Sequence, residues 1–265
     1  MKIDNLFNIQ NKTAIVTGGS RGIGEMITAG LLANGVKVYI SARKAPALIE
    51  KARELSEKYK QECIPIPCDL SNLDGINNFY KHISEKEDGI DFLINNAGAA
   101  WGEPFKDFSE TGWDKVMDLN VKSIFFLTQK IKPLLQKKSS LEDPSRVINI
   151  GSIDGLNVPA FETYSYSTSK AAVHHLTRVM AAKLVKDNIL VNAIAPGPYP
   201  SAMLGSAVNS DYSEIEKNNP RKRVGTPEDI AGLTIFLCSR AGAYTVGETI
   251  TSDGGIVKTT GHNLS

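Results

Sequence analysis

The feature that most constrains the fold is the regular alternation of short, β-branched or apolar runs with longer segments of helical periodicity. Short runs of this type predict buried strands, and helices between successive strands favour parallel pairing. The predicted strands are Thr13–Thr17, Val36–Ile40, Cys63–Pro67, Asp91–Asn95, Arg146–Ile150, Ile189–Ala195 and Thr249–Ser252. The pattern therefore predicts an α/β chain with a doubly wound, Rossmann-like, seven-stranded parallel sheet and helices on both faces.

Helical patterns connect these strands, with one irregular exception near the C-terminus. The first predicted helix follows a glycine-rich turn and stops at Asn34-Gly35, and the others are Ala47–Tyr59, Leu73–Lys86, Thr111–Gln136, Tyr166–Lys186 and Pro227–Ser239. Residues 196–220 are rich in Pro, Ser and Asn and have weak periodicity, so a lid with an apolar inner face is expected over about residues 197–222. Nothing divides the chain, and one domain over residues 1–265 is expected.

Composition narrows the classes of partner. Lys plus Arg number 30 against 29 Asp plus Glu, which gives no electrostatic reason to expect nucleic acid. Three cysteines without CxxC spacing fit small core residues in a reducing compartment, and no metal site is expected. No apolar stretch is long enough for a signal peptide or a membrane span, so a cytoplasmic protein without a membrane partner is expected.

The turn after the first strand, Thr17–Gly24, has the sequence TGGSRGIG. Glycines let such a backbone approach a pyrophosphate closely, and the following helix N-terminus supplies amide donors. The spacing is GxxxGxG rather than GxGxxG, so a glycine-rich turn without a ligand remains an alternative.

The end of the second strand indicates which dinucleotide would bind. The strand ends Ser41-Ala42-Arg43-Lys44, without the carboxylate that usually holds an NAD ribose. Arg43 offers a planar fork suited to a 2′-phosphate, and Arg21 could reach the same group. NADP(H) is therefore preferred over NAD(H), with plain surface charge as the alternative.

A tyrosine and a lysine with helical spacing supply candidate acid–base chemistry. Tyr166 and Lys170 stand at i and i+4 on one helix face, where a Lys⁺ would favour the phenolate and lower the tyrosine pKa. Such a pair is common by chance, but Ser152 follows a predicted strand whose carboxyl end lies at the ligand-binding edge of the sheet. Its hydroxyl could donate to a carbonyl oxygen. Asp69 and Asn95–Gly98 end two further strands on that edge.

These motifs together resemble the short-chain dehydrogenase/reductase family over nearly the whole chain. The turn TGxxxGIG, the NNAG segment, the adenine-contacting Asp, the Asn of LNVK, the Ser, the YxxxK pair and a Pro-Gly after the sixth strand all have counterparts. The resemblance implies a catalytic set of Asn120, Ser152, Tyr166 and Lys170. It implies cofactor contacts from Gly18, Ser20, Arg21, Gly22, Ile23, Gly24, Arg43, Asp69, Leu70, Asn96, Ala97, Gly98, Tyr166, Lys170, Pro196, Gly197 and Ser201, the last standing where threonine is more usual.

The resemblance also implies a mechanism, in which Tyr166 donates a proton to a carbonyl oxygen that Ser152 holds. Lys170 would lower the pKa of Tyr166 and bind the nicotinamide ribose, and Asn120 would position a water that resupplies protons. Within the family, the chain is most similar to bacterial NADPH-dependent 3-oxoacyl (β-ketoacyl) reductases, above all the rhamnolipid-linked type. A ketone or acyl thioester substrate and a homotetramer are therefore expected.

Other functions remain open at this point. The same motifs occur in reductases of other apolar, steroid-like or sugar ketones, and a non-catalytic NADP(H) sensor or a sugar-nucleotide epimerase are remote alternatives. Three further features are assigned no function. Asp154 and Glu162 are interpreted as solvated loop charge, His174 and His175 as packing or subunit contacts, and Trp101 as either a pocket wall or a core residue.

Overall fold

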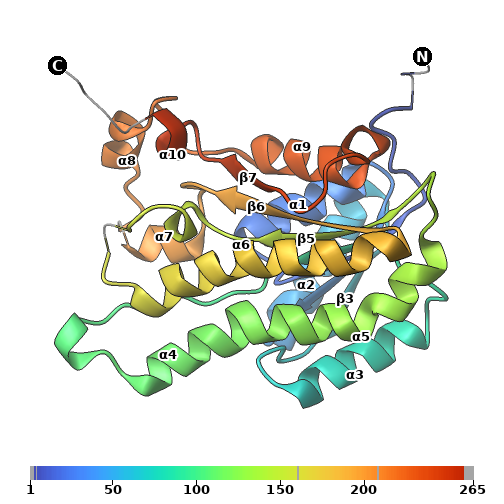
Figure 1. Cartoon of the computed structure of the whole chain (residues 1–265), viewed down its shortest axis with the longest axis horizontal. Coiled ribbons are helices and arrows are strands. Elements are labelled where there is room, and N and C mark those ends of the chain that lie inside the picture. The colour runs from blue at the N-terminus through green and yellow to red at the C-terminus, as the bar shows by residue number, and fades with distance from the viewer. Residues whose placement is uncertain (1–2, 4, 160, 208, 260–265) are drawn as a thin grey trace.

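The computed structural model describes residues 3, 5–159, 161–207 and 209–259. Within them, one parallel sheet has seven strands in the order β3-β2-β1-β4-β5-β6-β7, so the predicted sheet is confirmed (Figure 1). The strands are β1 Thr13–Thr17, β2 Lys37–Ala42, β3 Cys63–Pro67, β4 Phe92–Asn95, β5 Ser145–Ile150, β6 Ile189–Pro196 and β7 Thr249–Ser252. Because the chain runs outward to β3 and then restarts beside β1 with β4, a crevice forms at the carboxyl ends of β1 and β4.

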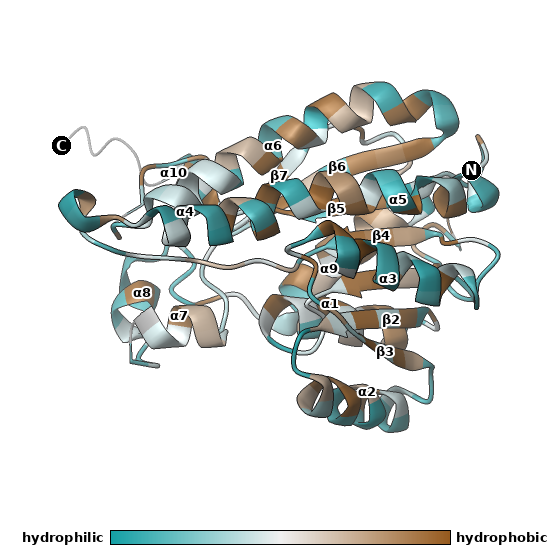
Figure 2. Ribbon diagram, turned by 90° about the horizontal axis from the view of Figure 1, so that it is seen from below, coloured by the Kyte–Doolittle hydropathy of each residue, from teal (hydrophilic) through white to brown (hydrophobic). Residues whose placement is uncertain are grey.

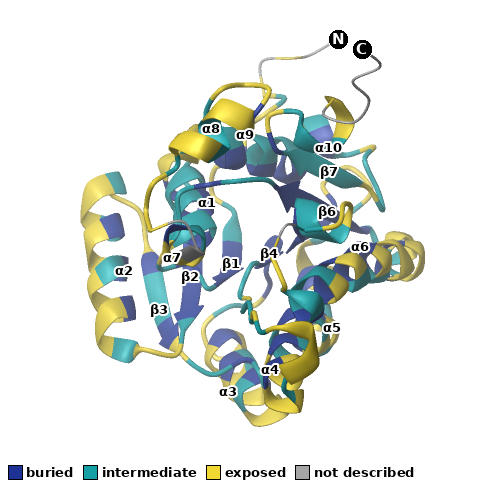
Figure 3. Cartoon of the chain, turned by 90° about the vertical axis from the view of Figure 1, so that its left-hand side faces the viewer, coloured by how far each residue is buried: buried dark blue, intermediate teal, exposed yellow. Residues whose placement is uncertain are grey.

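Helices cover both faces of the sheet. They are α1 Gly22–Ala33, α2 Ala45–Tyr59, α3 Leu73–Ser84, α4 Glu110–Met117, α5 Ser123–Lys138, α6 Tyr164–Leu184, α7 Ala202–Ala207, α8 Ser213–Asn218, α9 Pro227–Cys238 and α10 Ile256–Thr259. Figure 3 shows the buried strands in the middle of the molecule and the exposed outer face of α2 at its side. None of the described helices is both long and apolar enough to cross a membrane.

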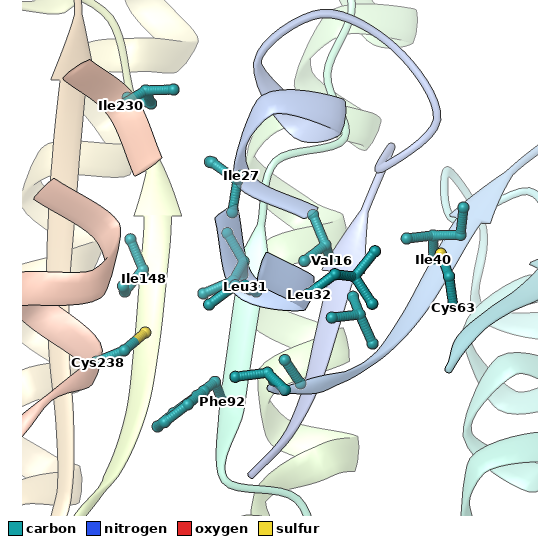
Figure 4. Packing of buried hydrophobic residues seen from close by; sticks show 14 of the residues in the cluster. Val16, Ile27, Leu31, Leu32, Ile40, Cys63, Phe92, Ile148, Ile230 and Cys238 are labelled. Carbon is teal, nitrogen blue, oxygen red and sulfur yellow. The ribbon is translucent and has the colours of Figure 1, made fainter. Parts of the chain in front are cut away.

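The core consists of two apolar layers, because successive side chains of a strand point to opposite faces. Val16 of β1 packs with Ile27 and Leu31 of α1 and Ile230 of α9 in one layer (Figure 4). Its neighbour Ile15 packs in the other layer, which α3, α5 and α6 cover. The middle of most strands is accordingly apolar, with polar residues mainly at strand ends and in β5 and β7, while the helices alternate between hydrophobic and hydrophilic positions (Figure 2).

The helix expected over Thr111–Gln136 differs from the observed structure in its middle. The chain is helical from Glu110 to Lys138, but a π-helical turn at Asp118–Lys122 separates α4 from α5. The amide of Ser123 donates to the carbonyl of Asp118, five residues earlier, and such one-turn π segments occur frequently at functional sites. A π-helical turn contains one residue more than an α-helical turn, and the spacing of apolar residues in the sequence is too coarse to reveal that difference.

The region expected to be irregular contains two short helices, α7 and α8. Each has six residues, which is too short for a periodic apolar stripe to be recognised in the sequence. Val208, one of the apolar lid residues, lies outside the described residues. The beginning of the segment contacts the glycine turn, since a Cβ on Gly22 would lie 3.2 Å from the Cβ of Ser201.

Candidate active site

A cavity of about 830 Å³ lies at the carboxyl ends of the strands, on the side of the molecule where α7 lies (Figure 1). All the predicted cofactor residues line it: Gly18, Ser20, Arg21, Gly22, Ile23, Gly24, Arg43, Asp69, Leu70, Asn96, Ala97, Gly98, Tyr166, Lys170, Pro196, Gly197 and Ser201. Ser152 lines it as well. Residues from six strand ends and the lid thus meet around one space, as the resemblance implied.

The glycine turn has a backbone that larger residues would not permit. Gly18 and Gly22 have φ values of 64° and 55°, and a Cβ on Gly24 would lie 2.2 Å from the carbonyl oxygen of Gly18. The side-chain amide of Asn96 donates to the carbonyls of Thr17 at 2.8 Å and Gly18 at 3.2 Å. Asn96 therefore connects the end of β4 to the turn and holds its shape.

The same end of the cavity contains two cationic side chains. Arg43, at the end of β2, and Arg21, at the N-cap of α1, are both exposed there, and neither has a carboxylate partner among the described residues. A tight glycine turn, a helix N-terminus and two free guanidinium groups fit a pyrophosphate and an additional phosphate on the ribose. The residues present therefore fit NADP(H).

The opposite end of the cavity contains the tyrosine–lysine pair. Because α6 begins at Tyr164, Tyr166 lies in its first turn and Lys170 one turn later. The ammonium nitrogen of Lys170 is 5.5 Å from the centre of the Tyr166 ring and donates to the carbonyl of Ile150 at 2.9 Å. Ser152 lies two residues after the end of β5, and its hydroxyl oxygen accepts the amide proton of Asp154 at 3.1 Å. The sheet and α6 thus bring Ser152 to Tyr166 across 14 residues of sequence.

Burial dominates the electrostatics of this pair. It raises the pKa of Tyr166 to about 12, against the opposing effect of a hydrogen bond from Ser152. It lowers the pKa of Lys170 to about 8, against the opposing charge of Asp154. The expected lowering of the tyrosine pKa by Lys170 is therefore not what this arrangement produces. Tyr166 is a protonated phenol at neutral pH, which is the form that can donate a proton.

Asn120 lies behind the wall of the cavity, in the π-helical turn. Its side-chain oxygen accepts the amide proton of Ala99 at 2.8 Å, and its amide nitrogen donates to the carbonyl of Ala99 and the hydroxyl of Ser169, each at 2.9 Å. The side chain therefore ties the loop after β4 to α6. Its role in positioning a water stays a prediction.

Three acidic residues of the cavity wall were missed or misinterpreted in the sequence. Glu103, Asp154 and Glu162 line the cavity. Asp154 is half-buried, so its interpretation as solvated loop charge is wrong, whereas Glu162 is an exposed loop residue, as that interpretation expected. The available signal was the position of Asp154 two residues after Ser152. Trp101 is not part of the cavity lining: its ring lies against Gly112, and the ammonium nitrogen of Lys115 is 4.4 Å from the ring centre.

His174 packs beneath the segment that holds Ser152. It is buried, its ring nitrogen Nε2 lies 3.5 Å from the amide nitrogen of Ser152, and a Cβ on Gly151 would lie 2.1 Å from the same nitrogen. Burial lowers the pKa of His174 to about 4, so the ring is neutral at physiological pH. Its assignment as a packing residue is thus supported within one subunit.

We expect Gly151→Ala to lower stability by about 2 kcal/mol, since the added methyl group collides with the buried imidazole. The same change should reduce kcat, because Ser152 is the next residue. Adding His174→Ala should restore part of both losses, whereas unrelated sites would give additive effects. The measurements are urea unfolding and steady-state kinetics. Gly232→Ala is the matched control, because a Cβ there meets nothing within 4 Å. Strict additivity of the double variant would contradict the assigned contact.

The cavity has the glycine turn at one end and Ser152, Tyr166 and Lys170 at the other, and it lies on a doubly wound sheet. This arrangement defines a dinucleotide-dependent oxidoreductase. Comparison with known proteins agrees. The family model described as enoyl-(acyl carrier protein) reductase matches residues 18–257. The chain belongs to the short-chain dehydrogenase/reductase family.

Individual relatives cover almost the entire chain. A rhamnolipids biosynthesis 3-oxoacyl-[acyl-carrier-protein] reductase of Pseudomonas aeruginosa is 44% identical over 94% of this chain and 97% of its own length. A 2-dehydro-3-deoxy-D-gluconate 5-dehydrogenase of Dickeya dadantii is 34% identical over 95% and 97%. The RhlG/NADP active-site complex of Pseudomonas aeruginosa superimposes with a TM-score of 0.91 at 43% identity, covering 95% of this chain and 98% of that one.

Proposed function

We propose that this protein is an NADP(H)-dependent reductase of ketones whose substrate is a 3-oxoacyl thioester. The observation that carries the proposal is a single cavity that holds the cationic glycine cradle at one end and Ser152, Tyr166 and Lys170 at the other. The 44% identity to a 3-oxoacyl-[acyl-carrier-protein] reductase supports the thioester. The apolar lid residues Met203 and Leu204, which line the cavity, fit an acyl chain.

Each catalytic residue has a proposed role that its position supports. The nicotinamide, when bound, supplies the hydride. Tyr166 donates its phenolic proton to the carbonyl oxygen of the substrate, since its pKa near 12 keeps that proton in place at neutral pH. Ser152 donates a hydrogen bond to the same oxygen and orients the carbonyl. Lys170 holds a positive charge beside Tyr166 and stabilises the phenolate left after transfer. Asn120 helps to hold α6, which carries Tyr166 and Lys170, in place through its hydrogen bonds to Ala99 and Ser169.

The test is to follow cofactor absorbance with NADPH and with NADH, offering an acetoacetyl thioester, a cyclic ketone and a sugar ketone. Oxidation of NADPH with the thioester is the expected result. If only the cyclic or the sugar ketone is reduced, the protein is still a ketone reductase, but its substrate is not a 3-oxoacyl thioester. Tight NADPH binding without turnover of any ketone would favour the sensor instead.

The cofactor preference yields a specific prediction for Arg43. Charge-assisted hydrogen bonds to a phosphate contribute about 1.5–3 kcal/mol, so Arg43→Ala should lower the NADPH-to-NADH ratio of kcat/KM by about tenfold to a hundredfold. Arg53→Ala is the control, since Arg53 is exposed on α2 and pairs with Glu50 and Glu57 outside the cavity. An unchanged ratio in Arg43→Ala would show that Arg43 does not contact the 2′-phosphate.

We also propose that the protein is a cytoplasmic homotetramer. Large apolar side chains are exposed on the helices expected to pair: Trp113 of α4, Phe125 of α5 and Val179 of α6 are 39%, 41% and 46% exposed. A second copy packed on this face would cover them. The three cysteines are free thiols, as expected in a reducing compartment.

A further inference from the structure

Charge is divided between the two halves of the cavity. Arg21 and Arg43 lie, together with the single carboxylate of Asp69, in the half formed by the glycine turn and the ends of β2 and β3. The other half is formed by the loops after β4 and β5 and by the lid, and the charged side chains among its described lining residues are all carboxylates: Glu103, Asp154 and Glu162. Lys170 is the one cation among the described lining residues at the boundary, so three carboxylates face one ammonium group. The substrate half is therefore negatively charged.

Two of these carboxylates are anchored by hydrogen bonds that fix their place in the wall. Glu103 accepts the amide and hydroxyl protons of Ser109 at 2.7 and 2.8 Å. Glu162 accepts the amide proton of Phe105 at 3.2 Å and the hydroxyl proton of Tyr164 at 2.9 Å. In each case both bonds go to one carboxylate oxygen, and no cation among the described residues pairs with either side chain.

Asp154 differs from both because it is next to the reacting groups. Its amide nitrogen is 3.1 Å from the hydroxyl oxygen of Ser152, and its charge acts on both Tyr166 and Lys170. Among the described residues, none donates a hydrogen bond to its carboxylate. A substrate carbonyl held by Ser152 would therefore lie near a half-buried carboxylate that accepts no hydrogen bond from the described residues and whose charge is opposed by Lys170 alone.

We infer that Asp154 is a specificity-determining residue that excludes ketones with a carboxylate near the reacting carbonyl and admits uncharged ones. The inference rests on the proposed function and narrows it. The accepted class is 3-oxo esters, thioesters and other neutral ketones, whereas free 3-oxo acids and keto sugar acids are rejected. Two unit charges roughly 6 Å apart at an effective dielectric constant of about 20 disfavour binding by roughly a hundredfold, and partial exposure reduces this to about tenfold.

The experiment compares two substrates with one carbon skeleton. Methyl acetoacetate is neutral, and acetoacetate has a carboxylate two carbons from its ketone. The ratio of kcat/KM for the ester to that for the acid is measured in the wild-type protein with NADPH. We expect a ratio of at least about ten, falling about tenfold in Asp154→Asn, which removes the charge and keeps the shape. Asp88→Asn, an exposed change before β4 at the opposite end of the sheet, should leave the ratio unaltered.

The outcomes separate this inference from the proposed function. A wild-type ratio near one, or an unchanged ratio in folded Asp154→Asn, overturns the role of Asp154 while ketone reduction stands. If Asp154→Asn does not fold, Asp154→Ser, which also removes the charge, must lower the ratio, and its failure to do so overturns the inference. Absence of NADPH oxidation with the ester, the acid and the acetoacetyl thioester would instead contradict the proposed function.

Discussion

Replacing Tyr166 by phenylalanine should lower kcat by about 10³-fold, because it removes the hydroxyl proposed to donate the proton and keeps the ring that packs beside Lys170. NADPH affinity should change little, since the glycine cradle and Arg43 are untouched. Stopped-flow or steady-state absorbance of NADPH measures the first effect, and fluorescence titration measures the second.

Tyr164→Phe is the matched control for this prediction. It makes the same chemical change two residues earlier on the same helix, at a hydroxyl that donates to Glu162 and lies outside the cavity lining. We expect its kcat to stay within about threefold of the wild-type value, as for a surface hydrogen bond. Equal losses in the two variants, or a Tyr166→Phe enzyme that retains most of its activity, would show that another group donates the proton.

The second large effect is expected on stability, from Arg146→Met. Arg146 opens β5, is 2% exposed, and has a guanidinium group that donates to the backbone carbonyls of Pro144, of Leu237 at 3.0 Å and of Ser239 at 3.2 Å. Two of these carbonyls close the C-terminus of α9, where a positive charge is favourable. Methionine fills similar volume but leaves buried acceptors unpaired, so we expect about 3 kcal/mol of lost stability by urea unfolding.

Arg146→Lys tests whether the stability comes from the three hydrogen bonds of the guanidinium group or from its positive charge. Lysine keeps the charge but cannot reach three divergent carbonyls, and we expect it to lose about half as much stability as methionine does. Arg178→Met serves as the surface control, because Arg178 is exposed on α6. If Arg146→Met unfolds with the same urea midpoint as the wild-type protein, the three carbonyls find hydrogen-bond partners without the guanidinium group.

The sequence predicts most of the fold because the relevant signals are local. Strand runs and helical periodicity identify the seven strands of the sheet, and Asn34-Gly35 ends α1, with Gly35 at a φ of 75°. The predicted strand bounds are within about two residues of those observed. The same reasoning missed the short helices α7 and α8 and the π-helical turn at Asp118–Lys122. Each of these elements has too few residues to alter the spacing of apolar residues in the sequence.

The residues that line the cofactor end follow from motifs contained within single turns and strand ends. Every cofactor position predicted from them lines the cavity. The interpretation of Asp154 as solvated loop charge was wrong, and the place of Glu162 in the cavity wall was missed, because their neighbours come from other elements. Glu162 is held by Phe105, 57 residues away, and Asp154 lies beside α6. A charged residue in a polar loop looks the same in the sequence whether it faces water or a cavity.

The sequence by itself determined the sheet, the glycine turn and the helical spacing of Tyr166 and Lys170, since each depends on residues only a few positions apart. The tertiary structure alone decided which charges lie in the substrate half, that Arg146 is buried under α9, and that Tyr166 keeps its proton at neutral pH. These properties depend on desolvation and on carbonyls, carboxylates and helix ends from distant parts of the chain. Burial raises the pKa of Tyr166 more than neighbouring groups lower it, and burial is a property of the packed molecule.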